Sequence, residues 1–529
     1  MPDDRQKRLI LVACILGSAI VFIDGTVVNV ALPAIREDLN AGLATQQWVM
    51  EAYLLMLGSL ILIGGSLSDL YGRRRVFTIG VIGFGVTSAL CAAAPNAVAL
   101  VVARALQGAA GALLVPSALA MIVDTFDEDE RGAAIGSWTA WGGVSTLVGP
   151  VLGGVLIQAT SWRLVFAISL VPVAATLYLL RRYVPEHLDA SVQRHVDVPG
   201  ALLCSLGLAG IVVGLIAQPD HGWGAAIVAG PIVAGVLCLG LFVAQERRSP
   251  DPMLPLELFR RRNFAVGNAA TLLMYAGLGA ATFFLPVYLQ QVAGYEPVKA
   301  GISLLPVTIV VFALSRRWGA LADRVGPRLF MSVGPVVAAA GLLLLLRLGH
   351  DAPYMTGVFP AMLVFGLGIS LTVAPLTAAV LAGVEDEHAG VASGVNNAVA
   401  RVAGLLAIGA VGAVVASQFG STLEERVAGA QLGSFGNQVA RARSRPLTVT
   451  HGDPTLHAAT VDASVDAFRA GMAAAALLTL LAGAISAVGI ENPRRRAAER
   501  CPGGAIVGAS QEVARGATPA APAAAATQS

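Results

Sequence analysis

GSLSDLYGRR, at residues 65–74, returns as GALADRVGPR at residues 319–328. The two stretches share a glycine, a leucine, an aspartate, a second glycine and an arginine at one constant offset of 254 positions. Each copy follows an apolar stretch and precedes another, with eight predicted spans separating the two. The copies therefore have parallel orientation, as in transporters whose halves are related by an axis along the membrane normal and hold substrate between them.

Composition indicates a protein made of membrane-spanning helices. Of 529 residues, 56% are hydrophobic and 13% are charged, and the mean hydropathy is +0.72. A soluble chain of this length needs more charge to cover its surface. Each predicted span has close to the ~20 residues that cross the hydrocarbon core. The fourteen predicted spans are 9–33, 46–68, 76–94, 98–122, 134–158, 162–181, 198–217, 224–244, 266–290, 299–316, 329–348, 355–382, 391–417 and 467–490.

The distribution of basic residues predicts the topology. With the N-terminus inside, cytoplasmic segments hold 24 of the 35 Lys and Arg residues, and external loops hold nine. This bias sets orientation in short loops, so we expect both termini in the cytoplasm and a multi-pass protein of the inner membrane. The first apolar stretch is long enough to span, which favours a first helix over a cleaved signal.

The repeat also predicts the domain organisation, an all-α membrane protein of two six-helix bundles with an inserted helix pair. The expected parts are a cytoplasmic N-terminus at 1–8, a first bundle at 9–182, an inserted pair at 183–250, a second bundle at 251–490 and a disordered cytoplasmic tail at 491–529. Within the second bundle, residues 418–466 read as a polar external loop with a short helix near 423–441.

Four motifs, one in a loop and three in predicted helices, resemble the major facilitator superfamily, in particular its fourteen-helix drug:proton antiporter branch. The repeated loop resembles the superfamily's signature between helices 2 and 3. The others are DGTVVNVALP from Asp24, RALQGAAG from Arg104 and GGVSTLVGPVLGG from Gly142, the last resembling the antiporter motif. The resemblance covers essentially the whole chain. It departs from the usual pattern at Ser68 and at Pro327.

Asp24 and Arg104 are the first candidates for proton coupling. A carboxylate within a span is costly, so Asp24 must be protonated, paired or turned toward protein or water. Arg104 keeps its proton and is predicted to lie at a similar depth, which makes it the natural partner. The resemblance links this arginine to proton transfer. The alternative is a static ion pair that fixes helix packing.

Glu51 is a third ionisable residue inside a span, at a position where the resembling family is usually uncharged. Three interpretations stay open: a second proton site, a partner for a cationic substrate, or an acid at headgroup level beside Trp48 and Tyr53. Asn29 and Arg401 are weaker candidates for the substrate cavity, with Arg401 alternatively belonging to a buried polar network.

Two further groups are candidates for conformational change. The loop copies predict a charge-and-dipole latch at helix ends, which the resemblance implies would stabilise an outward-open state; its arginines also serve as a positive-inside anchor. The latch residues are Gly65, Asp69, Gly72, Arg73, Arg74, Arg131, Asp323, Gly326 and Arg328. The antiporter motif predicts close helix packing around a proline. This packing either forms a flexible seal that controls leak and conformational change or only holds the helices together. The motif residues are Gly142, Gly149, Pro150, Gly153 and Gly154.

The sequence argues against an enzyme. Neither lysine follows a glycine, so there is no phosphate-binding loop, and no histidine begins a His-Glu-x-x-His metal site. We expect no metal and no cofactor, with a proton gradient as energy source. The leading hypothesis is a monomeric antiporter that exports drugs, antibiotics or other small lipophilic, in part cationic, compounds, without nucleic acid as a partner. The alternatives are an exporter of one endogenous secondary metabolite or siderophore, an importer, and a non-transporting membrane sensor.

Overall fold

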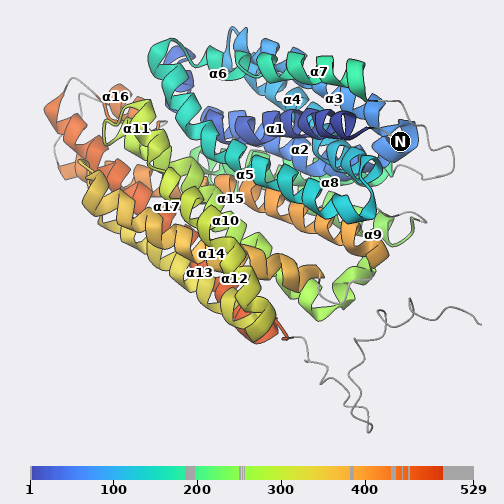
Figure 1. Cartoon of the computed structure of the whole chain (residues 1–529). Helices are drawn as coiled ribbons and strands as arrows, with labels where there is room; N and C mark the ends of the chain where they lie inside the picture. Colours follow the sequence, from blue (N-terminus) through green and yellow to red (C-terminus); the bar gives the residue numbers. More distant parts are fainter. Residues whose placement is uncertain are drawn as a thin grey trace, which may run out of the picture. The chain divides into compact units, whose positions relative to one another are not determined.

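The computed structural model describes residues 3–184, 197–249, 252, 254, 256–381, 386–429, 436–443, 445–450 and 453–492. Within this part of the chain the secondary structure is helical, without strands. Residues up to Glu491 form one compact unit (Figure 1). The tail predicted to be disordered lies outside the described residues, apart from its first two.

The first predicted bundle consists of helices in the expected places. They are α1 (Asp4–Asp38), α2 (Leu43–Tyr71), α3 (Arg73–Ala92), α4 (Ala97–Thr125), α5 (Glu128–Ala159), α6 (Arg163–Ala167) and α7 (Leu170–Tyr183). The short α6 and α7 together fill the span predicted at 162–181. The predicted inserted pair corresponds to α8 (Val198–His221) and α9 (Ala226–Glu246), which pack against each other.

The second half is helical as well. Its main elements are α10 (Arg262–Gln291), α11 (Pro297–Ile302), α12 (Leu305–Val325), α13 (Pro327–Leu344), α14 (Phe359–Leu381), α15 (Asp386–Gly429), α16 (Gly436–Arg443) and α17 (Pro454–Gly489). Single-turn helices occupy Leu256–Arg260, Leu345–Arg347 and Tyr354–Val358. Residues 418–466 contain more helix than predicted, because α15 continues to Gly429 and α17 already begins at Pro454.

Thirteen helical segments of the described residues are long and apolar enough to cross a membrane. The remaining predicted span, 46–68, falls on α2, which is 29 residues long. Its first turns carry Gln46, Gln47 and Glu51, and all three side chains are buried. The protein is therefore a multi-span membrane protein whose fold is all-α, as the sequence predicts.

The internal repeat is visible in the backbone. Gly72 joins α2 to α3 with φ of 93°, and Gly326 joins α12 to α13 with φ of 101°. Such angles strongly favour glycine, so both copies of the loop motif keep it where one residue connects two helices. The helices before these joints also pack alike, α2 against α4 and α12 against α14.

The two halves are joined by hydrogen bonds at one end of the bundle. We call the end where α1 stops the Asp38 end and the opposite end, with the α2–α3 joint, the Arg73 end. Arg36 donates to Gln291 over 2.7 Å, and Gln290 donates to the Val30 carbonyl over 3.1 Å. Arg445 donates to Asn40 over 2.6 Å. The Asp38 end is thus closed.

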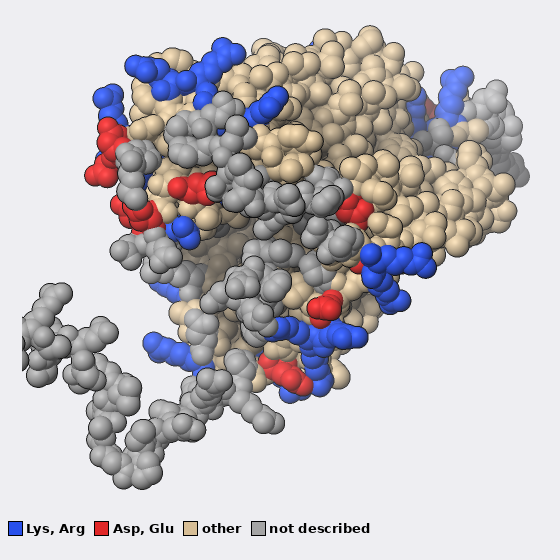
Figure 2. Space-filling model, turned by 90° about the vertical axis from the view of Figure 1, so that its right-hand side faces the viewer, with Lys and Arg blue, Asp and Glu red and all other residues tan. Residues whose placement is uncertain are grey.

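Figure 2 looks onto the end of the molecule that carries the N-terminus, which is the Arg73 end. Lys and Arg side chains lie around its margin, and the surface is hollowed near the middle, beside residues drawn grey. This is the end that the sequence predicts to be cytoplasmic.

Candidate functional site

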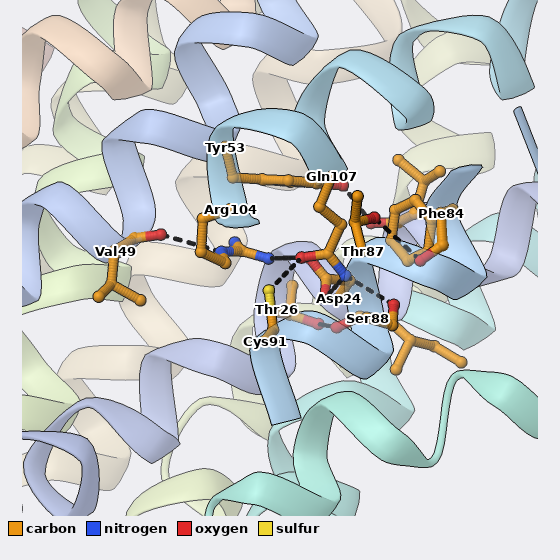
Figure 3. Close-up of polar contacts among 12 residues, drawn as sticks. Asp24, Thr26, Val49, Tyr53, Phe84, Thr87, Ser88, Cys91, Arg104 and Gln107 are labelled. Atoms are coloured by element: carbon orange, nitrogen blue, oxygen red, sulfur yellow. Dashed lines mark hydrogen bonds and ion pairs between the residues drawn. The ribbon is translucent and has the colours of Figure 1, made fainter. Parts of the chain in front are cut away.

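Asp24 of α1 and Arg104 of α4 form an ion pair inside the first half (Figure 3). Arg104 Nη1 donates to Asp24 Oδ2 over 2.6 Å, and both side chains are 0% exposed. A buried carboxylate needs a paired cation and hydrogen bonds to stay ionised. The structure thus brings together the two residues that the sequence proposed as partners.

Gln107 completes the coordination of this pair. Its Nε2 donates to Asp24 Oδ1 over 3.2 Å and to Ser88 Oγ over 2.8 Å. Its Oε1 accepts from Arg104 Nη1 over 2.7 Å and from the Cys91 thiol over 3.6 Å. The network therefore links α1, α3 and α4. Sequence analysis assigned no role to Gln107, although it follows Arg104 by three residues and so shares its helix face.

Arg104 also ties the pair to α2. Its Nε donates to the Val49 carbonyl over 2.9 Å, and its guanidinium lies 4.2 Å from the centre of the Tyr53 ring. Its Nη2 is buried without a hydrogen-bond partner among the described residues. Gly108, one turn further along α4, lies so close to the Tyr53 carbonyl that a Cβ there would overlap with it. The glycine therefore lets α4 approach α2 closely enough for these contacts.

The small residues of the antiporter motif in α5 face α1. A Cβ on Gly142 would lie 3.1 Å from the Phe22 ring, and one on Gly153 would lie 2.8 Å from the Val27 carbonyl. One on Gly149 would overlap with the Thr26 hydroxyl. Close helix contact through small residues is thus present, on the segment of α1 that carries Asp24.

Pro150 alters the hydrogen bonding of this interface. Because proline has no N–H, the Thr146 carbonyl loses its helical partner. The Thr26 hydroxyl lies 3.4 Å from that carbonyl and 3.1 Å from the Ile23 carbonyl of its own helix. A side chain two residues after Asp24 therefore bridges α1 and α5.

Beside this stripe, α5 also packs against the second half. A Cβ on Gly154 would lie 2.6 Å from Val298 Cα, and one on Gly301 of α11 would overlap with the Pro150 carbonyl. Backbone thus meets backbone where the two halves touch. The antiporter motif residues form one interface on α1 and another on α11, and their role as a seal stays a prediction.

The predicted latch lies partly within the described residues. Arg73 forms an ion pair with Asp124 of α4 and donates to the Ala120 carbonyl over 3.2 Å. Gly65 and Gly319 pack against α4 and α14, where a Cβ would lie 3.7 Å from Pro116 and 3.3 Å from Ala374. The side chains of Asp69 and Asp323 lie outside the described residues, so their part in the latch stays a prediction.

The latch arginines do not share one environment. Arg74 is half-buried, and Arg328 is exposed and donates to the Ala487 carbonyl of α17 over 2.8 Å. Arg131 has a buried Nε without a hydrogen-bond partner among the described residues. The role of these arginines in a latch stays a prediction.

An ion-pair group at the Arg73 end was not predicted. Lys7 of α1 contacts Asp127 over 2.8 Å and Glu130 over 2.7 Å, which ties the start of α1 to the start of α5. The hydrogen bond from Lys7 lowers the pKa of Asp127. A signal in the sequence was available, since Lys7 is one of two lysines in the chain.

The remaining candidates lie apart from the Asp24 network. Asn29 is buried in α1, and its Oδ1 has no hydrogen-bond partner among the described residues. Arg401 of α15 is half-buried beside Gly58 of α2. Glu51 of α2 is buried within protein, not exposed at headgroup level. The roles of Asn29 and Arg401 in a substrate cavity stay predictions.

The chain is similar to known transport and resistance proteins. The sequence profile of the Major Facilitator Superfamily matches residues 14–408. A puromycin resistance protein of Streptomyces alboniger is 35% identical over 94% of each chain. A tetracenomycin C resistance and export protein of Streptomyces glaucescens is also 35% identical, over 82% of this chain and 80% of that protein. A multidrug resistance protein of Mycobacterium tuberculosis is 33% identical over 80% and 78%.

Solved structures show the same fold at low identity. A bacterial homologue of the human lysosomal transporter Spinster superposes with a TM-score of 0.63, at 17% identity, over 93% of this chain and 100% of that one. The xylose transporter XylE from E. coli gives a TM-score of 0.55, at 14% identity, over 93% and 98%.

Proposed function

Because the chain belongs to the major facilitator superfamily, whose members are transporters and not enzymes, we propose that it exports small lipophilic compounds in exchange for protons. It acts in the inner membrane as a monomer, with both termini in the cytoplasm, by alternating access. The gradient supplies the energy: one charge that crosses 100 mV contributes about 2.3 kcal/mol.

The Asp24–Arg104 pair carries this proposal. In this structure, in which the Asp38 end is closed, Asp24 accepts hydrogen bonds from Arg104 and Gln107. These hydrogen bonds stabilise its ionised form. A proton that binds Asp24 cancels the charge that holds Arg104. Arg104 then keeps its contacts to α2, at Val49 and Tyr53, but loses its tie to α1. Protonation thereby changes the contact between α1 and its neighbours.

The position of Asp24 connects this step to movement. The same segment of α1 packs through Thr26 and Val27 on the glycines of α5, and α5 in turn packs on α11 of the other half. A change at Asp24 therefore reaches the interface between the halves through two helix contacts. This supports a role for the α5 glycines in conformational change.

The names of the relatives favour antibiotics as substrates. Puromycin and tetracenomycin C appear in the names of two relatives, and a third is described as a multidrug resistance protein. A second candidate function is export of a single secondary metabolite, since another relative is described as a probable actinorhodin transporter. A lipophilic cation is one form of substrate that a membrane exporter of this kind would take.

Reconstituted vesicles test the proposal. Wild-type protein and Asp24→Asn are placed in vesicles with an imposed pH gradient, and ethidium movement is followed together with lumenal pH. We expect ethidium to drive proton movement in wild type and not in the variant, because the amide cannot take up a proton. Glu37→Gln is the matched control, an exposed acid on the same helix, and should behave as wild type.

Either of two results would contradict the proposal. If Asp24→Asn still exchanges ethidium for protons, another group carries the proton. If wild type moves neither, the protein is instead a dedicated metabolite exporter or a non-transporting sensor.

A further inference from the structure

Glu51 lies where three parts of the protein meet. It belongs to α2, and α2 packs against α8 of the inserted pair and against α15 of the second half (Figure 1). The side chain is 0% exposed. Neither carboxyl oxygen has a hydrogen-bond partner in the part of the chain that the structure describes. The carboxyl is thus sealed in the junction without a compensating hydrogen bond from any described residue.

The face of α15 is shaped to receive polar side chains from α2. Gln47, one turn before Glu51, donates to the Ile408 carbonyl over 2.9 Å, and a Cβ on Gly412 would overlap with the Gln47 amide. A Cβ on Gly409 would lie 3.5 Å from Glu51 Oε1. Gly412 therefore lets α15 of the second half approach Gln47 closely, and Gly409 brings its backbone near the Glu51 carboxyl.

The inserted helix α8 seals the same place from the side. Leu215 lies 3.3 Å from where a Cβ on Gly409 would be. An apolar cluster continues around the junction through Leu55 of α2, Val212 and Ile216 of α8 and Leu405 of α15. Glu51 thus lies in hydrocarbon-like surroundings, where an ionised carboxylate without partners is strongly disfavoured.

No described cation compensates the charge. Arg104 of α4 is engaged with Asp24 of α1 and with the Val49 carbonyl. Arg401 of α15 lies beside Gly58, about two turns along α2 from Glu51. On α8 and its N-cap the described ionisable groups are Asp197, Cys204 and His221. Of these, Cys204, which is not a cation, packs against the same apolar cluster. The charges of α3 are at its Arg73 end. Tyr53 is stacked under Arg104.

We infer that Glu51 is a second proton-binding site, which holds a proton while the Asp38 end is closed and releases it when α2 and α15 separate there. It differs from Asp24, which has its partners within one half of the protein. Glu51 is covered by the opposite half, so its environment changes with the opening itself. A proton that is taken up and released only at the Asp38 end does not cross the membrane, so this inference concerns proton-dependent closure and does not rest on the proposed export function.

The direction of the pH effect follows from linkage. The closed state binds one more proton than the open state, so closure is favoured as pH falls and opening is favoured as pH rises. Where the exposed carboxyl is ionised and the closed one is not, the opening equilibrium rises by up to about tenfold per pH unit.

Amide hydrogen exchange of the full-length protein in lipid nanodiscs tests this inference. Exchange is measured for peptides covering residues 44–54 and 404–414, between about pH 6 and about pH 8, in wild type and Glu51→Gln. Comparison at the same pH cancels the intrinsic chemistry of exchange. We expect the ratio of wild-type to variant exchange to grow with pH, by up to about tenfold per unit, because the amide keeps the junction closed at every pH.

Two further variants separate the carboxyl from the interface. Gln47→Ala removes the neighbouring hydrogen bond to α15 without touching an acid, and should speed exchange by the same factor at every pH. Glu51→Asp keeps an acid and should keep the pH dependence. A ratio that stays constant with pH would overturn the inference. If, in addition, ethidium slows amide exchange in wild type but not in Glu51→Gln, Glu51 is instead an anchor for a cationic substrate. Loss of coupling in the Asp24→Asn vesicles bears on the export function and leaves this result unaffected.

Discussion

Asp24 and Glu51 are both buried carboxyl groups on neighbouring helices, but they are compensated in opposite ways. Asp24 accepts hydrogen bonds from an arginine and a glutamine, whereas neither oxygen of Glu51 has a partner among the described residues. Burial alone therefore does not define the chemistry of an acid in a membrane protein. The partner decides whether the carboxyl is ionised, and the position of that partner decides which movement its proton is coupled to.

The largest expected effect comes from making Asp24 resemble Glu51. Arg104→Ala leaves Asp24 buried and unpaired, and breaking one partner of a buried pair costs about 3–5 kcal/mol. Thermal unfolding of the purified protein should show this loss, together with loss of coupled proton movement.

The double variant Arg104→Ala with Asp24→Asn is the control for that prediction. It removes the charge that was left alone, so most of the stability should return while coupling stays absent. Equal destabilisation in the single and the double variant would mean that Arg104 acts through packing on Tyr53 and not through its charge.

A smaller effect is expected when Asp24 keeps its cation but loses its second partner. Gln107→Leu removes the amide that contacts Asp24, Arg104 and Ser88, and an unsatisfied buried group costs about 1–3 kcal/mol. Proton-coupled ethidium movement should persist with an altered pH profile. An unchanged profile would show that Arg104 alone sets the protonation of Asp24.

The smallest effect is expected at an exposed acid with a partner. Lys7→Met removes the contact that lowers the pKa of Asp127. Asp127 should then titrate at a higher pH, visible by NMR of labelled aspartate, while thermal stability near neutral pH hardly changes because water screens the pair. In wild type this contribution is present above the ordinary pKa of aspartate and is lost as pH falls through the lowered value. A large drop in stability near neutral pH would contradict this account.

The sequence was enough to predict the fold and the central ion pair. Long apolar stretches must form helices in a bilayer, the repeated loop with Gly72 and Gly326 marks the two halves, and an acid and an arginine at similar depth within spans are natural partners. The network around the pair was not predictable, since Gln107, Ser88 and Cys91 are residue types that occur equally in helix packing. The same holds for Glu51, because α15 and α8 are separated from it by more than a hundred residues and sequence spacing does not show which helices meet there.

The predicted loop at 418–466 differs from the structure for a related reason. The polar residues after Gln418 break the hydropathy pattern that marks a span, but they do not prevent a helix. Residues such as Glu424 and Arg443 pair with each other across the connection between α15 and α16. Polarity in this region thus indicates where a span ends and does not indicate where a helix ends.

The proline of α5 has a consequence for how α1 and α5 can move against each other within the first half. The Thr26 hydroxyl has one hydrogen and lies within reach of carbonyls on its own helix and on α5, so rotation about one side-chain bond exchanges one acceptor for the other. The contact between α1 and α5 can then be broken and remade with the number of hydrogen bonds nearly unchanged. This contact therefore does not favour displacement of α1 in either direction along α5. The direction of movement is set by the protonation of Asp24.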